Sequence, residues 1–532
     1  MAHTTHPTNA RDAHRANWAA VATALILLGA YVIVCTWQID RPIWYDEAWL
    51  VDDAMQPGLT KSLGSATAYR HPVSIGFLAM VHAAVEPGSN RPWMARVPSM
   101  FFGGCTLLCA GWLVGSVIQH RAAGFACVAV LLACPAFQRY ALEIKQYIPA
   151  AMFILLLLCA AAAWCRTGGR PAAYLWLGAA VAGILVAYSA WLMVAASGLI
   201  VFCTWALRRD RPQILRTLVF GVTSAAVAAT VYFGFARELM STQTDGAYWQ
   251  GYFLPRNMDV LAQTFHLCVD RFAEAWYLYE LPRVVWIAAI AAMFVGWVAW
   301  LVRERVAALI LLAFFILLWL ANVVGVWPHA VRVNIGPLLL AHLCVMLGPL
   351  LIVKFLVGRW APRISDAAQR ATNYAGPLAC LLLVSAVLFA SRNVRFETAS
   401  VDRLFDQLVQ QVRADDLLLL DTTTFVTQRI TGTQLRGQTR RVRWPSKETV
   451  LSEYLPLIRG ASASRVLIPF GHYSPPLANT FGILRDAVEA DGQWQTLWPD
   501  DDDPVKHVVL LAFTPGRLRT ADHEIGNATQ AD

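Results

Sequence analysis

The stretch ALEIKQYIPAAMFILLLLCAAAAW, residues 141–164, joins a charged segment directly to an apolar run. Comparable apolar runs of about 18–24 residues recur between residues 18 and 391, and this length crosses the hydrocarbon core of a bilayer. The chain of 532 residues is 57% hydrophobic and only 15% charged, whereas soluble domains carry roughly 25% charged residues. The sequence therefore predicts a polytopic α-helical membrane protein.

The apolar runs predict about eleven transmembrane helices. They lie at 18–37, 97–118, 122–137, 148–165, 173–188, 190–207, 214–236, 284–302, 306–326, 334–357 and 374–391. A further run at 72–85 is short and follows His71, so we expect a short re-entrant or juxtamembrane helix there rather than a span. The first run is longer than a signal-peptide core and lacks a small-x-small cleavage site, which favours a retained first span.

The C-terminal part of the chain has a different composition, with many charges and short β-like runs. Apolar residues at helical spacing over 399–412 precede strand-like runs at 417–421, 465–469 and 507–513. We therefore expect two domains, a transmembrane domain at 1–391 and a small α/β soluble domain at 392–532.

The basic residues of the membrane part concentrate in short loops between apolar runs, where positive charge marks the cytoplasmic side. The loops that contain Arg121, Arg166, Arg208, Arg303 and Arg359 fall on one side if the run at 72–85 does not cross. We predict a multi-pass protein of the inner (plasma) membrane, with a cytoplasmic N-terminus and an extracytoplasmic C-terminal domain. Because the net charge of +8 resides largely in such loops, we expect membrane lipids and no nucleic acid as partners.

Asp46 and Glu47 stand in the first outer loop, in the stretch RPIWYDEAWLVDDA at 41–54. One interpretation is a charged loop end beside interfacial aromatic residues, because Trp and Tyr are enriched at membrane–water boundaries. The functional interpretation is a carboxylate held near the membrane surface as a general base that deprotonates a hydroxyl. Asp52 and Asp53 are expected to be solvated residues of the following loop.

Glu143, Lys145 and Tyr147 alternate in the segment that separates two apolar runs on the same outer side. A lone Glu-x-Lys pair is usually a surface ion pair that contributes little to stability. Charged groups squeezed between two spans, however, tend to be functional. This segment is therefore a candidate part of a site.

Two further outer segments carry cations. Arg70 and His71 precede the short run at 72–85, and they are either an ordinary helix cap or a site where a helix N-terminus attracts an anion. His329 and Arg332 lie in a tight turn between two runs, where an arginine either reaches the interface or binds phosphate through its paired donors. Acids and cations gathered at one membrane boundary suit a lipid-phosphate substrate, in which the acids activate an acceptor hydroxyl and the cations hold the phosphate leaving group.

The order of these motifs resembles that of the integral-membrane glycosyltransferases with the GT-C fold. Asp-Glu at 46–47 is followed by His-Pro at 71–72 and by Arg-Val-Pro-Ser at 96–99. The stretches ALEIKQYIPAAMFILLL (141–157) and WPHAVRVNIGPLLL (327–340) are similar to segments of the bacterial branch that uses polyprenyl-phosphate sugars. The superfamily includes the protein O-mannosyltransferases and the lipid A aminoarabinose transferases, and the resemblance covers about residues 1–390.

This resemblance implies a fold and a reaction. A sugar is transferred from a polyprenyl-phosphate-linked donor to a hydroxyl of a lipid, glycan or protein acceptor, with inversion at the anomeric carbon. Asp46 would be the catalytic base, and Glu47 its neighbour in the motif. His71 matches the His-Pro of the family, although the family usually has a second proline where this chain has Val73.

The resemblance also implies how the donor phosphate is held. Glu143 corresponds to a second outer-loop acid, Lys145 and Tyr147 match the branch motif, and Arg332 matches a phosphate clamp. Some members place Asp in the second outer loop, which leaves metal dependence open. A divalent cation, Mg or Mn, bound by Asp46 and Glu143 is one way to neutralise the phosphate, and Lys145 with Arg332 is the other.

Two other classes of function compete with a glycosyltransferase. A transporter or flippase for a lipid-linked sugar would favour ionisable groups within spans and broken helices near the midplane. The acids of this chain are predicted in loops instead, which disfavours that class. The third class is a non-catalytic envelope assembly protein whose C-terminal domain binds a partner.

Overall fold

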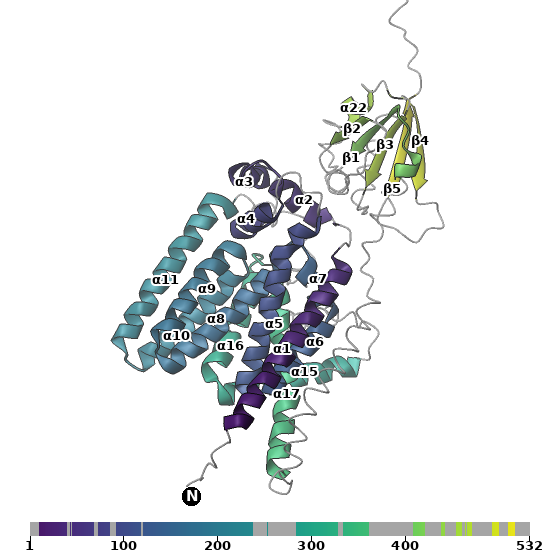
Figure 1. The fold of residues 1–532 in the computed structure, drawn as a ribbon. Coiled ribbons are helices and arrows are strands. Elements are labelled where there is room, and N and C mark those ends of the chain that lie inside the picture. Colours follow the sequence, from purple (N-terminus) through teal and green to yellow (C-terminus); the bar gives the residue numbers. More distant parts are fainter. Residues whose placement is uncertain are drawn as a thin grey trace, which may run out of the picture. The chain divides into compact units, whose positions relative to one another are not determined.

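Helices make up most of the described part of the chain in the computed structural model (Figure 1). The structure describes residues 10–39, 45–68, 73–85, 92–118, 121–237, 283–327, 334–360, 408–420, 438–441, 454–459, 465–470, 492–498 and 509–515, and the single residues 43, 253 and 463. The predicted span at 374–391 lies outside these residues.

The chain divides into two units, which are described separately. The first unit comprises Met1–Ile39, Gly58–Ala84 and Ala95–Val394, and it contains the membrane helices. The second unit comprises Asp40–Pro57, Val85–Met94 and Arg395–Asp532. The first predicted outer loop is therefore split between the two units.

The helices of the first unit follow the predicted apolar runs. The long ones are α1 (Ala10–Gln38), α5 (Val97–Ile118), α6 (Arg121–Ala133), α8 (Tyr147–Thr167), α9 (Arg170–Val186), α10 (Ala190–Leu207), α11 (Arg211–Val231), α15 (Arg283–Arg303), α16 (Arg305–Val323) and α17 (Ile335–Trp360). Within the described residues, six helices are long and apolar enough to cross a membrane, or up to seven if a bent pair counts as one span. The chain is thus a multi-pass membrane protein, while the predicted count of about eleven spans is not confirmed.

The predicted span at 122–137 is not one continuous helix, and whether the bent pair crosses the membrane as a single span stays a prediction. The chain bends by 74° between Ala123–Ala133 and α7 (Pro135–Leu142). Pro135 lacks a backbone N–H and disfavours helical conformation in the preceding residue, and Cys134 is extended, with φ −72° and ψ 115°. As a result Arg139 and Tyr140, expected in a loop, lie on α7.

α8 is the centre of the bundle. In its most apolar window 83% of the residues are buried, the largest share among the candidate spans of the described residues. It packs against α5, α9, α10, α16 and α17 (Figure 1). The contact with α17 is close at Gly336, where an added Cβ would stand 2.6 Å from Ile154 Cδ1 and 3.3 Å from the Cα of Ala151. Glycine at this position therefore allows the two helices to approach.

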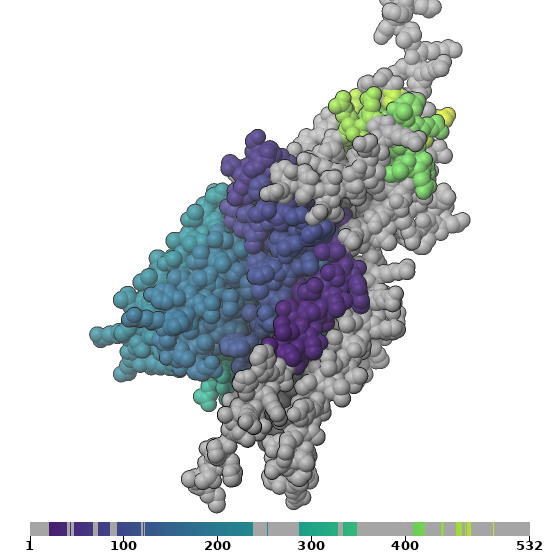
Figure 2. Space-filling model, viewed as in Figure 1, coloured from purple at the N-terminus to yellow at the C-terminus, as the bar shows by residue number. Residues whose placement is uncertain are grey.

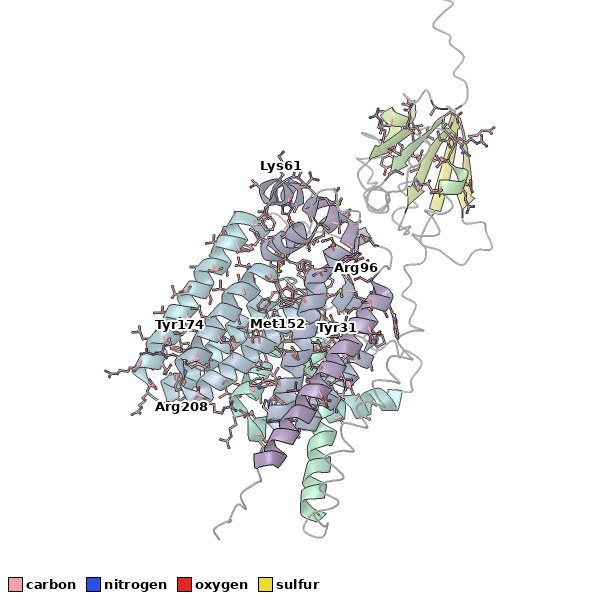
Figure 3. All side chains as sticks on the ribbon, viewed as in Figure 1. Tyr31, Lys61, Arg96, Met152, Tyr174 and Arg208 are labelled. Atoms are coloured by element: carbon pink, nitrogen blue, oxygen red, sulfur yellow. The ribbon has the colours of Figure 1, made fainter. Side chains whose placement is uncertain are left out.

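One end of the bundle, here called the basic end, collects the loops that carry arginines. The guanidinium of Arg208 donates to the Cys165 carbonyl across 2.5 Å, so the α10–α11 turn meets the end of α8. Arg166 Nη1 lies 3.2 Å from Glu304 Oε1, which joins α8 to the α15–α16 turn. Figure 3 shows Arg208 at this end of the bundle and Arg96 toward the opposite end. The basic loops thus share one end, and their cytoplasmic location remains a prediction.

Two short helices, α3 (Leu59–Ala68) and α4 (Ile75–Ala84), lie at the end of the bundle opposite the basic end (Figure 1). α4 has 10 residues, too few to span a bilayer. Its start is fastened to the α9–α10 turn, because Ser74 Oγ donates to the Val186 carbonyl and the Tyr188 hydroxyl donates to the Val73 carbonyl at 2.6 Å. The apolar run at 72–85 is therefore a short helix, as predicted.

The described part of the C-terminal segment contains a five-stranded sheet with the order β2-β1-β3-β5-β4. The strands are β1 (Asp416–Leu420), β2 (Gln438–Arg441), β3 (Arg465–Phe470), β4 (Gly492–Trp498) and β5 (Val509–Pro515). β1 runs parallel to β2 and β3, whereas β5 is antiparallel to β3 and β4. Asp416 and Arg465 form an ion pair at 2.8 Å that joins the starts of β1 and β3.

Three of these strands were expected from apolar runs, and two were not. β1, β3 and β5 correspond to the predicted runs at 417–421, 465–469 and 507–513. β2 (QTRR) has no apolar residue, and β4 (GQWQTLW) has too few for a buried run. Of the predicted helix at 399–412, the described part is helical over 408–411, and 399–407 lies beyond the described residues.

Candidate functional site

Asp46 and Glu47 lie on a helix rather than in a loop, which corrects the expectation. They occupy the first turn of α2 (Tyr45–Ala54), in the second unit. Carboxylates in the first turn of a helix are stabilised by the positive end of the helix dipole. Glu47 is fully buried, and the side chain of Asp46 is outside the described residues.

Asp52 and Asp53 are not solvated, contrary to the expectation for them. Because α2 extends to Ala54, both aspartates belong to the helix, and their exposed fractions are 1% and 0%. Burying a carboxylate is costly unless the group is paired or hydrogen-bonded. A 10-residue helix that buries three acids, Glu47 included, is therefore a candidate functional segment of the second unit.

The segment between α7 and α8, residues 143–146, is the candidate site of the first unit and is called the α7–α8 junction. Glu143 and Lys145 are both buried there, with exposed fractions of 1% and 4%. Arg139 on the last turn of α7 lies with its Nε 3.8 Å from Glu143 Oε2. The amide of Lys145 donates to the Glu143 carbonyl at 2.7 Å, which closes a tight bend. The structure thus buries an acid and a base, two residues apart in the chain, directly before a membrane helix.

The start of α5 holds this junction in place. Ser99 Oγ donates to the Glu143 carbonyl at 2.7 Å. Three residues earlier, the fully buried Arg96 donates to the Ile39 carbonyl at the end of α1. The Arg-Val-Pro-Ser sequence therefore connects α1, α5 and the α7–α8 junction (Figure 3 labels Arg96). Neither role was predicted, although an arginine directly before an apolar span was a signal for one.

Aromatic rings line the same junction. Tyr140 on α7 and Tyr147 at the start of α8 meet edge to face, with ring centroids 5.7 Å apart and planes at 88°. The Arg139 guanidinium lies 5.8 Å from the Tyr140 ring centroid, within the range of a cation–π contact. Tyr147 is half-buried. The ring contact joins the end of α7 to the start of α8 across the junction.

The late turn between α16 and α17 is fastened at both of its ends. Asn322 Nδ2 donates to the Trp327 carbonyl at 2.7 Å, and Trp327 Nε1 donates to Asn334 Oδ1 at 3.1 Å. Both asparagines are buried. His329 and Arg332 lie between these anchors in the sequence, but they are outside the described residues. Arg70 and His71 are outside the described residues as well. The two asparagines were not predicted from the sequence, because single amides in or beside apolar helices have no distinctive spacing.

Among the described side chains, no group of three or more His, Cys, Asp and Glu residues is placed to hold a metal ion. Glu143 lies near the cation Arg139, and the hydroxyl of Ser99 bonds the Glu143 backbone. The side chain of Asp46 is outside the described residues, so a metal site that includes Asp46 and Glu143 stays a prediction.

The first unit is thus a multi-pass helical bundle with buried charges collected opposite its basic end. Neither the protein-family models nor the curated proteins contain a match to the sequence. Among solved structures, the chain is similar to ArnT from Cupriavidus metallidurans bound to undecaprenyl phosphate. The TM-score is 0.53 and the identity 12%, over 92% of this chain and 97% of that chain. For ArnT in the apo state, the TM-score is 0.52 and the identity 13%, over 93% and 98% of the two chains.

The similarity extends over nearly the full length of both proteins. At 12–13% identity, the structural similarity establishes the fold and does not identify the residues that carry function. The chain therefore has the fold of ArnT, the GT-C fold that the order of its motifs indicates.

Proposed function

We propose that the protein is a glycosyltransferase that moves a sugar from a polyprenyl-phosphate-linked donor to an acceptor hydroxyl on the outer face of the membrane. The observation that carries the proposal is the fold shared with ArnT, which has been crystallised with undecaprenyl phosphate. Because this fold accommodates one polyprenyl phosphate in ArnT, it is suited to bind a sugar donor that carries the same lipid phosphate. The buried charges at the α7–α8 junction provide the polar groups that such a substrate needs.

In the proposed reaction Asp46 takes the proton of the acceptor hydroxyl. The acceptor oxygen forms a bond to the anomeric carbon from the face opposite the phosphate, and the bond from that carbon to the phosphate oxygen breaks. The sugar is transferred with inversion, and polyprenyl phosphate leaves with the electron pair. Glu47 is the neighbouring carboxylate that supports the position of Asp46.

The departing phosphate gains negative charge, and the proposal assigns Lys145 and Arg332 to neutralise it. Fixed cations in a water-poor site stabilise developing charge strongly because they need no reorganisation during the reaction. Lys145 is buried beside Glu143, so its position is constrained before the substrate arrives. Tyr147, His71, Arg70 and His329 are assigned to substrate binding.

A divalent cation, Mg or Mn, is an alternative source of positive charge for the phosphate. Lys145 and Arg332 supply charge without it, so the two arrangements differ in their response to chelation. Protein dialysed against EDTA is expected to keep its turnover if the side chains suffice. Loss of turnover on chelation, restored by added Mg²⁺ or Mn²⁺, would assign Asp46 and Glu143 to a metal instead.

The proposal is tested by replacing Asp46 with asparagine, which keeps the size but removes the base. Glycolipids and glycans of a deletion strain are compared by mass spectrometry after complementation with wild type, Asp46→Asn or Glu304→Gln. We expect wild type and Glu304→Gln to restore the same modified product and Asp46→Asn to restore none, at equal membrane levels. Restoration by Asp46→Asn would remove the base assignment, and an unchanged product profile in the deletion strain would contradict the transferase itself.

A further inference from the structure

A groove of about 360 Å³ runs between α1, α5 and α6 in the first unit. It is lined by Ala24 and Leu27 from α1, by Leu108 and Trp112 from α5, and by Phe125 from α6. Figure 2 shows α1, in purple, at the surface of the bundle. The volume is within the range of about 300–1,000 Å³ that is typical of ligand sites. It is separate from the α7–α8 junction, whose residues do not line it.

Close packing of α5 and α6 shapes this groove. A Cβ added at Gly124 would collide with the Gly111 carbonyl oxygen, so the two helices touch through their backbones there. Leu108 and Trp112 flank the contact and are each 54% exposed. An apolar trough with exposed apolar rims is stable in a membrane only when hydrocarbon fills it, because a void loses dispersion contacts along its walls.

The groove is charged at one end only. Arg121, the first residue of α6, lines it together with Ser116, and both lie where α5 and α6 meet at the basic end. Arg303 donates to the Val117 carbonyl at 3.5 Å, which places a second cation at the same end of α5. On α5 the lining extends from Leu107 to Ser116, about 14 Å at the rise of an α-helix. That is about half of the ~30 Å hydrocarbon core, the depth of one leaflet.

We propose that this groove binds an anionic glycerophospholipid, with one acyl chain along the trough and its phosphate at Arg121. The length matches a chain of one leaflet, and the charge at the mouth is complementary to a phosphate headgroup. The inference rests on the fold alone and does not require the proposed transferase activity. A donor polyprenyl phosphate is a different occupant, because the proposed function places its phosphate at the opposite end, near Lys145.

The test measures lipid retained by the purified full-length protein. The protein is delipidated in detergent and incubated with phosphatidylglycerol, phosphatidylcholine or undecaprenyl phosphate, and bound lipid is counted by native mass spectrometry. Wild type is expected to retain phosphatidylglycerol in preference to phosphatidylcholine. Arg121→Gln is expected to lower phosphatidylglycerol binding about fivefold, the effect of about 1 kcal/mol for one basic residue near anionic lipid.

Two matched pairs of variants distinguish a specific lipid site from nonspecific attraction of anionic lipids to exposed arginines. Arg170, the first residue of α9, is also an exposed arginine that begins a helix. The Arg170→Gln variant is expected to bind phosphatidylglycerol as wild type does. Ala24→Trp fills the groove from α1 and is expected to reduce binding, whereas Ala22→Trp, on an exposed position outside the lining, is not. Equal losses within either pair would overturn the proposal. So would equal retention of both lipids, or preferential retention of undecaprenyl phosphate that Ala24→Trp abolishes.

Discussion

The two ends of the membrane bundle carry their polar residues in opposite ways. At the end formed by the start of α5, the α7–α8 junction and the α9–α10 turn, called the buried polar end, the charged groups of Arg96, Glu143 and Lys145 are almost fully buried. At the basic end the charges are largely exposed, as in the pair Arg166–Glu304, whose side chains are 56% and 28% exposed.

The two ends differ in the free energy that their charged groups lose when they are removed from water. Exposed arginines lose little hydration, so the charges of the basic end cost little free energy in the folded protein. Buried charges at the opposite end lose their hydration and must be offset by pairing and hydrogen bonds. Protein stability alone gives no reason to keep them, since apolar residues of similar volume often serve as well. The proposed substrate chemistry would supply that reason, and the following variants test it.

The largest effect is expected from Lys145→Met at the buried polar end. Loss of a fixed cation near developing charge costs about 10²–10³-fold in turnover, whereas Lys145→Arg keeps the charge and is expected to retain more. The measurement is release of polyprenyl phosphate by the purified protein. Lys61→Met is the control, because Lys61 is exposed on α3 at the same end of the bundle (Figure 3). Equal turnover of both methionine variants would leave Lys145 a structural residue.

A smaller loss is expected for Ser99→Ala, which removes the 2.7 Å bond to the Glu143 carbonyl. The carbonyl still accepts from the Lys145 amide, so the free energy of unfolding should fall by only about 0.5–1.5 kcal/mol. The effect on turnover should be larger than this loss of stability implies. A misplacement of a site by 1 Å can lower turnover by ~10²-fold, and we expect a loss approaching that size. Melting temperature and turnover are both recorded.

Thr106→Val is the matched control for Ser99→Ala. Thr106 is buried on the same helix, and among the described residues its hydroxyl bonds only the Phe102 carbonyl, within α5 at 2.7 Å. We expect it to change stability by a similar amount and leave turnover intact. Parallel loss of turnover in both variants would show that general loosening of α5, and not the position of Glu143, limits the reaction.

The same chemical change made in two turns gives a third comparison. Trp327→Phe removes the Nε1–H bond to Asn334 at 3.1 Å beside the turn that holds Arg332, and Trp297→Phe removes a 3.2 Å bond to the Ala308 carbonyl between α15 and α16. Each should lower the free energy of unfolding by about 0.5–1.5 kcal/mol. Only Trp327→Phe is expected to reduce turnover, by a few fold. Equal turnover of the two variants would show that the Asn322–Trp327–Asn334 anchor has no role in the reaction.

The sequence predicted best what depends on composition and on local pattern. Apolar runs located the membrane helices to within a few residues, as α5 and α10 show. Charge between two spans identified Glu143 and Lys145 as exceptional residues, and the structure buries both. The short helix α4 followed from the length of its apolar run.

What the sequence did not predict depends on contacts between distant residues. Ser99 meets the Glu143 carbonyl across 44 positions, and no local pattern encodes such a pair. The break at Cys134 was missed because apolar residues continue through Pro135, although the proline itself was a signal. Asp52 and Asp53 were assigned to solvent by the usual behaviour of acids, which holds only when the flanking helix is exposed.

The smallest effect is expected at the basic end, for Glu304→Gln. This change removes the ion pair with Arg166, whose nitrogen and oxygen lie 3.2 Å apart. Exposed pairs of this kind contribute about 0–1 kcal/mol and are screened by salt. The melting temperature of the variant should therefore differ from wild type at low ionic strength and converge with it as salt is added, with turnover unchanged throughout. A salt-independent loss of stability, or a loss of turnover, would show that the basic end is built like the buried polar end, and the contrast between the two ends would not hold.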